Sequence, residues 1–292
     1  MNQEIVSSQA PAKTQKLWTY HNGAWEKRED LLAVEAPLEI RLGYKEKSKR
    51  TEKSLSITMR TPGQDLELVM GFLLGEGIIQ KKEEVVSIQH CRKIEKEESL
   101  GNVVRVELID KLIPDFKKLE RNFLSNSSCG ICGKASIEAV QDLHCNFLEY
   151  EGKGISPQIL QALSQKLSKQ QYIFKHTGGL HAAALFDEEG HLLLLKEDVG
   201  RHNALDKLIG AALYQDLLSL KNCILLLSGR ISFELVQKAL AAELGLIVAV
   251  GAPSSLAVEL AEASGITLVG FAKEKRFNLY THPQRIQIEL PR

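Results

Sequence analysis

The sequence lacks an excess of charge of either sign. Lys and Arg together number 37, as do Asp and Glu, so the formal net charge at pH 7 is zero. A neutral chain has no global basic field with which to attract nucleic acid or an anionic membrane surface. It also lacks any apolar run near the roughly 18 residues of a membrane-spanning helix. We therefore expect neither nucleic acid nor a membrane among its partners, and an anionic ligand would have to meet a local basic patch.

The N-terminus lacks the pattern of a secretory signal peptide, because Met1–Ser8 has neither a basic start nor an apolar stretch. The five cysteines are an odd number, which does not suit a closed set of disulfides. We therefore expect a reduced, cytoplasmic protein. Residues 1–15 are polar and predict a disordered leader. The full 292 residues are enough to bury a core without disulfides.

Residues 16–120 predict a small α+β region. Leu38–Leu42 and Leu55–Arg60 alternate apolar and polar residues, which is typical of half-buried strands. Gln64–Leu74 has helical spacing and ends at glycines. Two more strands are expected at Val85–Ile88 and Val103–Leu108.

Residues 121–292 predict an α/β domain. Leu180–Phe186 and His191–Lys196 flank a turn and predict a hairpin. From Ala204 onward helices and strands alternate, which implies parallel strands covered by helices on both faces. Strands are expected at Cys223–Leu227, Leu246–Val250 and Ile266–Phe271, and helices at Pro157–Leu167, Ala204–Leu213, Phe233–Leu244 and Ser254–Ala263.

The stretch Ser127–Lys134 carries the strongest chemical motif, with Cys129 and Cys132 two residues apart beside glycines. Such a pair can share a metal, exchange a disulfide or carry sulfur covalently. The helix expected after it, together with Lys134, would lower the pKa of a nearby thiol and favour the thiolate. Residue chemistry alone does not choose between the two cysteines as nucleophile.

A zinc site is the weaker interpretation. Zinc nucleobase deaminases combine Cys-x-x-Cys with His-x-Glu. Here His181 is followed by Ala183 where the acid would stand, and it comes after the cysteines instead of before them. A structural zinc ion would need four ligands, and the sequence offers no second Cys-x-x-Cys. We therefore expect no structural metal, and sulfur carriage remains.

Three turns are expected at the carboxyl ends of the parallel strands, where ligands bind in open α/β sheets. Ser228, Gly229 and Arg230 offer a hydroxyl, a close backbone approach and a guanidinium, which suit an anion pocket. Gly251–Ser255 carries no charge, whereas Phe271–Arg276 is basic. The segment Glu197–Asp206 is also rich in catalytic residue types. The alternative is that these residues only begin a helix, where acids in the first turn are favoured by the macrodipole. We favour a functional role for the segment.

The chain resembles the formate dehydrogenase accessory sulfurtransferases, the FdhD family. The resemblance runs from about Pro37 to Ile286. It is carried by five blocks of sequence, namely Ser128–Gly133, Thr177–His181, Glu197–Lys207, Ser228–Arg230 and Phe277–His282. Lys273-Glu274-Lys275 differs from the glycine-bearing turn expected in the family.

This resemblance implies a cytoplasmic homodimer with a three-layer, cytidine-deaminase-like core. It implies that sulfur arrives as a cysteine persulfide from a cysteine desulfurase. The sulfur then passes to the molybdenum (or tungsten) bis-guanine-dinucleotide cofactor, before insertion of that cofactor into formate dehydrogenase. Cys129 would be the carrier and Cys132 its partner. The residues expected to meet the cofactor, including a GDP-like end, are Ser228, Gly229, Arg230, His202, Phe271, Ala272, Lys273, Glu274, Lys275 and Arg276.

Two other classes of function remain open. The first is a non-catalytic chaperone that binds the cofactor and uses its cysteines only for contact or redox sensing. The second is a zinc hydrolase. Formation of a persulfide separates sulfur transfer from the chaperone, and metal analysis tests the hydrolase.

Overall fold

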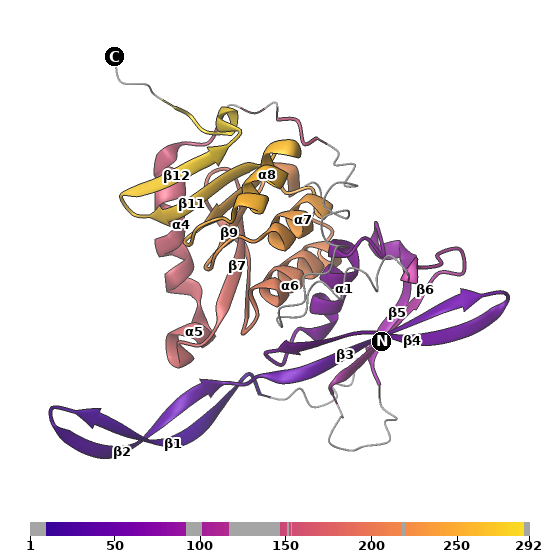
Figure 1. Ribbon diagram of the computed structural model, residues 1–292, viewed down its shortest axis with the longest axis horizontal. Coiled ribbons are helices and arrows are strands. Elements are labelled where there is room, and N and C mark those ends of the chain that lie inside the picture. Colours follow the sequence, from indigo (N-terminus) through magenta and orange to yellow (C-terminus); the bar gives the residue numbers. More distant parts are fainter. Residues whose placement is uncertain are drawn as a thin grey trace.

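The computed structural model describes residues 10–91, 101–116, 147–150, 152, 154–217 and 220–288. The Cys-x-x-Cys stretch lies outside these residues, so the roles of Cys129 and Cys132 stay predictions. Two sheets enclose a layer of helices, and a long hairpin projects to one side (Figure 1).

The N-terminal sheet has four strands in the order β4-β3-β6-β5. β3 pairs antiparallel with β4 and parallel with β6. Leu38, Ile40 and Leu42 on β3 are fully buried, because alternate side chains point to the face that shares a core with helix α1. This confirms the four strands and the helix expected here. Their bounds are β3 (Ala36–Glu46), β4 (Lys49–Arg60), α1 (Asp65–Gly75), β5 (Val85–His90) and β6 (Val103–Leu108).

The first two strands were not predicted. β1 (Ala12–His21) and β2 (Ala24–Ala33) form an antiparallel hairpin that extends away from the rest of the molecule (Figure 1). Asn22 and Gly23 both have positive φ, of 50° and 85°, as a two-residue hairpin turn requires. Because β1 starts at Ala12, residues 12–15 belong to a strand, and the expected leader is too long at its C-terminal end.

The second sheet has six strands in the order β12-β11-β10-β9-β7-β8. β9, β10 and β11 are parallel, as expected. β7 runs antiparallel to both β8 and β9, which confirms the predicted hairpin, and β12 runs antiparallel to β11. The bounds are β7 (His181–Phe186), β8 (Leu192–Asp198), β9 (Ile224–Leu227), β10 (Leu246–Ala249), β11 (Thr267–Lys273) and β12 (Arg276–Thr281). The last of these strands was not predicted.

Helices cover both faces of this sheet, as expected. Alternate residues of β9 separate into two cores: Leu225 and Leu227 pack with α6, α7 and α8, and Ile224 and Leu226 pack with α4. The helices are α4 (Pro157–Gln170), α5 (Tyr172–Thr177), α6 (Arg201–Tyr214), α7 (Phe233–Ala241) and α8 (Ser255–Ala263), and short 3₁₀ turns occur at Lys82–Glu84, Leu220–Asn222 and Pro283–Arg285. No helix among the described residues is both long and apolar enough to span a membrane.

α1 and α6 join the N-terminal sheet to the six-stranded sheet. A Cβ atom added at Gly71 would lie 1.9 Å from Asp206 O, and one added at Gly210 would lie 1.8 Å from Glu67 O. The helix backbones therefore touch at two glycines. One continuous apolar core runs from β3 through α1 and α6 to β9. The region before residue 120 thus shares its core with the larger domain.

Candidate functional site

The carboxyl ends of β9, β10 and β11 meet at one edge of the six-stranded sheet. Because β7 is antiparallel to β9, its first residue, His181, lies at this edge. Asp198, the last residue of β8, pairs in register with His181. α6 begins shortly afterwards at Arg201. This edge is where ligands bind in open α/β sheets, and it collects several of the predicted residues.

Backbone hydrogen bonds join the successive turns at this edge. Gly251 N–H donates to Gly229 O at 3.1 Å, and Phe271 N–H donates to Gly251 O at 3.0 Å. A Cβ atom added at Gly251 would lie 2.7 Å from Gly229 O, so this approach requires glycine. The structure therefore brings together Gly229 and Phe271, two residues predicted to meet the cofactor.

Ser228 and Arg230 flank Gly229 but differ in their availability. The Ser228 hydroxyl accepts a hydrogen bond from Ala182 N–H at 2.8 Å, which fastens the turn to β7. Arg230 is exposed and forms no hydrogen bond or ion pair with any residue that the structure describes. The guanidinium is thus available to an anion, whereas the serine oxygen already has a structural partner.

His202, also predicted to meet the cofactor, lies in the first turn of α6. Its Nε2 is 2.9 Å from Glu234 Oε2 and 3.1 Å from Ser232 Oγ, both at the start of α7. The hydrogen bond with His202 lowers the pKa of the Glu234 carboxyl by more than burial raises it. His202 therefore stands at the edge, with one ring nitrogen held by its own chain.

The basic segment Phe271–Arg276 forms the end of β11 and the start of β12. Phe271 is half-buried with a φ of 53° and interrupts the register between the two strands. Ala272 is buried in the core that contains α4, so its side chain faces away from solvent. The remaining four predicted residues, Lys273, Glu274, Lys275 and Arg276, are exposed at the tip of this hairpin.

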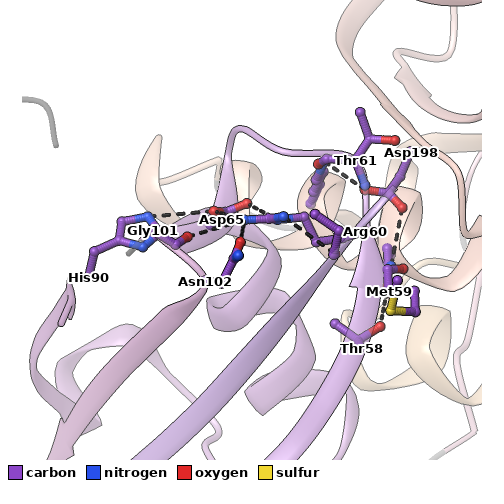
Figure 2. Close-up of polar contacts among 12 residues, drawn as sticks. Thr58, Met59, Arg60, Thr61, Asp65, His90, Gly101, Asn102 and Asp198 are labelled. Carbon is purple, nitrogen blue, oxygen red and sulfur yellow. Dashed lines mark hydrogen bonds and ion pairs between the residues drawn. The ribbon is translucent and has the colours of Figure 1, made fainter. Parts of the chain in front are cut away.

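Asp198 has a structural role in the described residues. Its Oδ2 is 2.7 Å from Lys207 Nζ and accepts a hydrogen bond from Thr61 N–H at 3.0 Å, a contact visible in Figure 2. Its Oδ1 accepts from Gly200 N–H at 2.9 Å and from Asn203 Nδ2 at 3.1 Å. Every oxygen of this fully buried carboxylate is used to hold the end of β4 against the start of α6.

A second buried pair fixes the same end of β4. Arg60 donates from Nε to Asp65 Oδ1 at 2.8 Å and from Nη2 to Asp65 Oδ2 at 2.9 Å. Nη2 also approaches Gly101 O and the Asn102 side chain, each at 3.2 Å. Figure 2 shows these contacts, with His90 3.6 Å from the Asp65 carboxylate on the other side. Burial lowers the pKa of His90.

The three acidic residues of Glu197–Asp206 all have structural partners, and a functional role for the cluster stays a prediction. Glu197 accepts hydrogen bonds from the first amides of α5, Ile173 at 3.0 Å and Phe174 at 2.8 Å. Asp206 is buried against Lys238. The residue types in the sequence do not show that these carboxylates have hydrogen-bond or ion-pair partners in the fold. Of the cluster, Arg201 and His202 remain at the open edge.

The two described cysteines are poor nucleophiles. Cys91 and Cys223 are both half-buried and free of disulfides. Burial raises the pKa of each thiol above its ordinary value. A raised pKa lowers the thiolate fraction at neutral pH, and the thiolate is the reactive form.

Ligands for a metal do not gather at this edge in the described part of the chain. Ala183, which stands where a deaminase would have its glutamate, is fully buried among apolar side chains. The one described group with three possible ligands is Asp187, Glu189 and His191, in the turn at the other end of β7. The absence of a structural metal stays a prediction.

The model of the FdhD/NarQ family matches residues 33–287. The chain belongs to the FdhD/NarQ family. The resemblance inferred from the motifs is thereby confirmed.

Relatives within this family cover nearly the whole chain. A protein of Mycolicibacterium paratuberculosis named sulfur carrier protein FdhD is 47% identical over 260 residues, 89% of this chain and 93% of its own. A protein of the same name from Sulfurisphaera tokodaii is 41% identical and covers 94% of this chain and 98% of its own. The crystal structure of a candidate formate dehydrogenase accessory protein from Desulfotalea psychrophila covers 94% of this chain and 99% of its own, with a TM-score of 0.70 at 24% identity. This structural similarity supports the mixed α/β fold.

Proposed function

We propose that this chain is a sulfur carrier for the maturation of formate dehydrogenase. The observation that carries the proposal is its identity of 41 to 47% to sulfur carrier proteins over about nine-tenths of its length. The described cysteines support it by exclusion. Because burial raises the pKa of Cys91 and Cys223, the carrier is expected among the other three cysteines, and family resemblance assigns it to Cys129 of the Cys-x-x-Cys pair.

Sulfur would arrive from a cysteine desulfurase in the cytoplasm. The Cys129 thiolate attacks the terminal sulfur of the desulfurase persulfide, so a new S–S bond forms on Cys129 and the desulfurase regains its thiol. In the release step the Cys132 thiolate attacks the inner sulfur of Cys129. A Cys129–Cys132 disulfide forms and sulfide leaves, so two thiols are oxidised while the sulfane sulfur is reduced. A spacing of two residues suits this exchange.

The sulfur acceptor would be the molybdenum or tungsten bis-guanine-dinucleotide cofactor, bound as a substrate. The glycine turns at Gly229 and Gly251, with the exposed Arg230 beside them, suit a diphosphate of this cofactor. The exposed basic tip from Lys273 to Arg276 would meet a guanine nucleotide end. The expected cytidine-deaminase-like layering and the homodimer belong to this proposal.

Intact mass spectrometry after incubation with a cysteine desulfurase and cysteine tests the carrier role. The wild-type chain should gain the mass of one sulfur atom, and Cys129→Ala should not. Cys132→Ala should gain the sulfur and retain it, and Cys223→Ala serves as the matched control that behaves as wild type. Sulfur retained on Cys129→Ala would refute the assignment. Binding of GDP without any sulfur uptake would instead favour a cofactor-binding chaperone.

A further inference from the structure

Arg201 lies at the candidate edge. Its Nε is buried and has no hydrogen-bond acceptor among the residues that the structure describes. No described residue forms an ion pair with the guanidinium. A buried donor without an acceptor costs about 1 to 3 kcal/mol. A ligand that supplied an acceptor here would remove this cost.

His181 faces the same turn. Its Nδ1 lies 3.2 Å from the position that a Cβ atom on Gly229 would occupy, and Arg201 Cδ lies 4.0 Å from that position. Any side chain in place of Gly229 would therefore enter the space beside both residues. The glycine keeps its backbone open to His181 on β7 and to Arg201 on α6.

The carboxylates nearby balance the positive charge at this edge only in part. Glu234 is taken by His202, and Asp198 is taken by Lys207. Arg201 and Arg230 form no ion pair among the described residues, although the charge of Arg201 contributes to the lowered pKa of Glu234. α6 also has no acidic residue and no side-chain cap in its first turn. Arginine there opposes the helix macrodipole and lowers stability.

We propose that Arg201 and His181 form an anion subsite beside Gly229 that binds a phosphate group of a nucleotide diphosphate. The inference rests on the proposed function, because a guanine dinucleotide cofactor supplies that diphosphate. Arg201 donates a charged hydrogen bond from its guanidinium, and His181 donates a second bond once it is protonated. The sequence motifs did not identify Arg201 or His181 as residues that bind a ligand. An arginine in the first turn of a helix that has no acidic residue there could have indicated an anion site.

The subsite binds a proton together with the anion. In the free protein burial lowers the pKa of His181 most, and the positive charges of Arg201 and His202 on α6 lower it further, while Asp198 on β8 raises it. The turn after β9 carries the exposed Arg230 next to Gly229, but its charge is not among the causes that shift the pKa of His181. A bound phosphate adds negative charge and raises the pKa of His181. Affinity should therefore increase as the pH falls from 7 toward 6, and the protein should take up protons on binding.

Calorimetric titration with GDP, inorganic pyrophosphate and guanosine tests the subsite. Arg201→Gln should weaken the binding of GDP and pyrophosphate by about tenfold or more, because one charged hydrogen bond is lost. Guanosine, which has no phosphate, should not be affected. Lys221→Gln is the matched control, since this exposed lysine pairs with Glu243 away from the edge. Equal affinity of wild type and Arg201→Gln for pyrophosphate would overturn the proposal.

Two further measurements exclude a purely structural role. Thermal unfolding of Arg201→Gln without ligand should occur at the wild-type temperature or above it, because the substitution removes an unpaired charge. A lower temperature would identify a structural residue and overturn the proposal. Titrations in two buffers of different ionisation enthalpy should show less proton uptake in His181→Gln than in wild type, and equal uptake would remove His181 from the subsite.

The failure of this inference is distinct from failure of the proposed function. If Cys129 accepts sulfur but Arg201→Gln binds pyrophosphate normally, the carrier role stands and the subsite does not. If pyrophosphate binding depends on Arg201 but no sulfur is accepted, the subsite stands and the carrier role fails.

Discussion

Replacement of Lys238 by methionine should destabilise the fold strongly and in a pH-dependent way. Lys238 Nζ lies 2.8 and 3.0 Å from the two carboxylate oxygens of Asp206 and 3.3 Å from Glu76 Oε1. The three side chains come from α7, α6 and the end of α1; Lys238 and Asp206 are buried, and Glu76 is partly buried. This cluster therefore joins the helices that connect the two sheets.

The size of the stability loss follows from the carboxylates that the substitution leaves unpaired. Methionine fills a similar volume but leaves the buried Asp206 and the partly buried Glu76 without their counter-ion, which costs about 3 to 5 kcal/mol. Burial already raises the pKa of Asp206 to about 6, although Lys238 opposes it. Burial lowers the pKa of Lys238, but Asp206 and Glu76 outweigh burial and raise it overall. The lysine is thus charged in the native protein, and its loss should raise the pKa of Asp206 further.

The raised pKa of Asp206 determines how the stability of the variant changes with pH. A carboxyl whose folded pKa is raised favours the fold below its unfolded pKa of about 3.9, and this contribution is lost as the pH rises through the folded pKa. The stability of Lys238→Met should therefore lie furthest below wild type near pH 8 and approach it near pH 5. Urea unfolding followed by circular dichroism measures this gap.

Two controls isolate the cause. The double variant Lys238→Met with Asp206→Asn should recover part of the loss, because it removes one of the unpaired charges. Lys221→Met removes an exposed lysine 3.6 Å from Glu243 and should change stability by less than about 1 kcal/mol. A Lys238→Met protein within about 1 kcal/mol of wild type at pH 8, or a loss that does not shrink at pH 5, would refute the reasoning.

Two other substitutions test the packing around the site. Gly71→Ala should cost about 1 to 3 kcal/mol in urea unfolding, because its Cβ would overlap Asp206 O on α6. Ser168→Ala, at an exposed position of α4, should be neutral. A neutral Gly71→Ala would contradict the observed helix contact. Asp198→Asn should lower stability by about 3 kcal/mol or more, because the ion pair with Lys207 is lost. The folded variant should still accept sulfur on Cys129. Loss of sulfur uptake at full stability would instead make Asp198 a functional residue.

The six-stranded domain was largely predictable because its signals are local. Strands such as Cys223–Leu227 are short apolar runs, and the helices between them have an apolar stripe that repeats every turn. Their order alone implies parallel pairing with right-handed crossovers. β12 was not predicted, although Phe277 and Leu279 alternate with polar residues and pack against the core that contains α4.

The pairing of α1 with α6 was not predictable in the same way. Nothing near Gly71 in the sequence identifies Asp206 as its neighbour, because the contact depends on how two distant segments meet. The same limit applies to the site. Asp198 and Arg201 both resemble catalytic residue types, and only their hydrogen bonds show that the first is fully used while the second is not.

A final prediction concerns the β1–β2 hairpin, which the composition of the chain does not indicate. Both tryptophans of the chain, Trp18 and Trp25, lie on it and are more than half exposed. None of its residues belongs to either apolar core, and the family match starts only at residue 33. Two-stranded hairpins are at best marginally stable alone, so this one adds little to the fold.

A chain that begins at Ala33 should therefore lose about 1 kcal/mol or less in urea unfolding and accept sulfur as the full chain does. Iodide should quench both tryptophans of the native full-length chain. A shortened chain that unfolds much more easily, or tryptophans that iodide cannot reach, would show that the hairpin packs against the body of the protein.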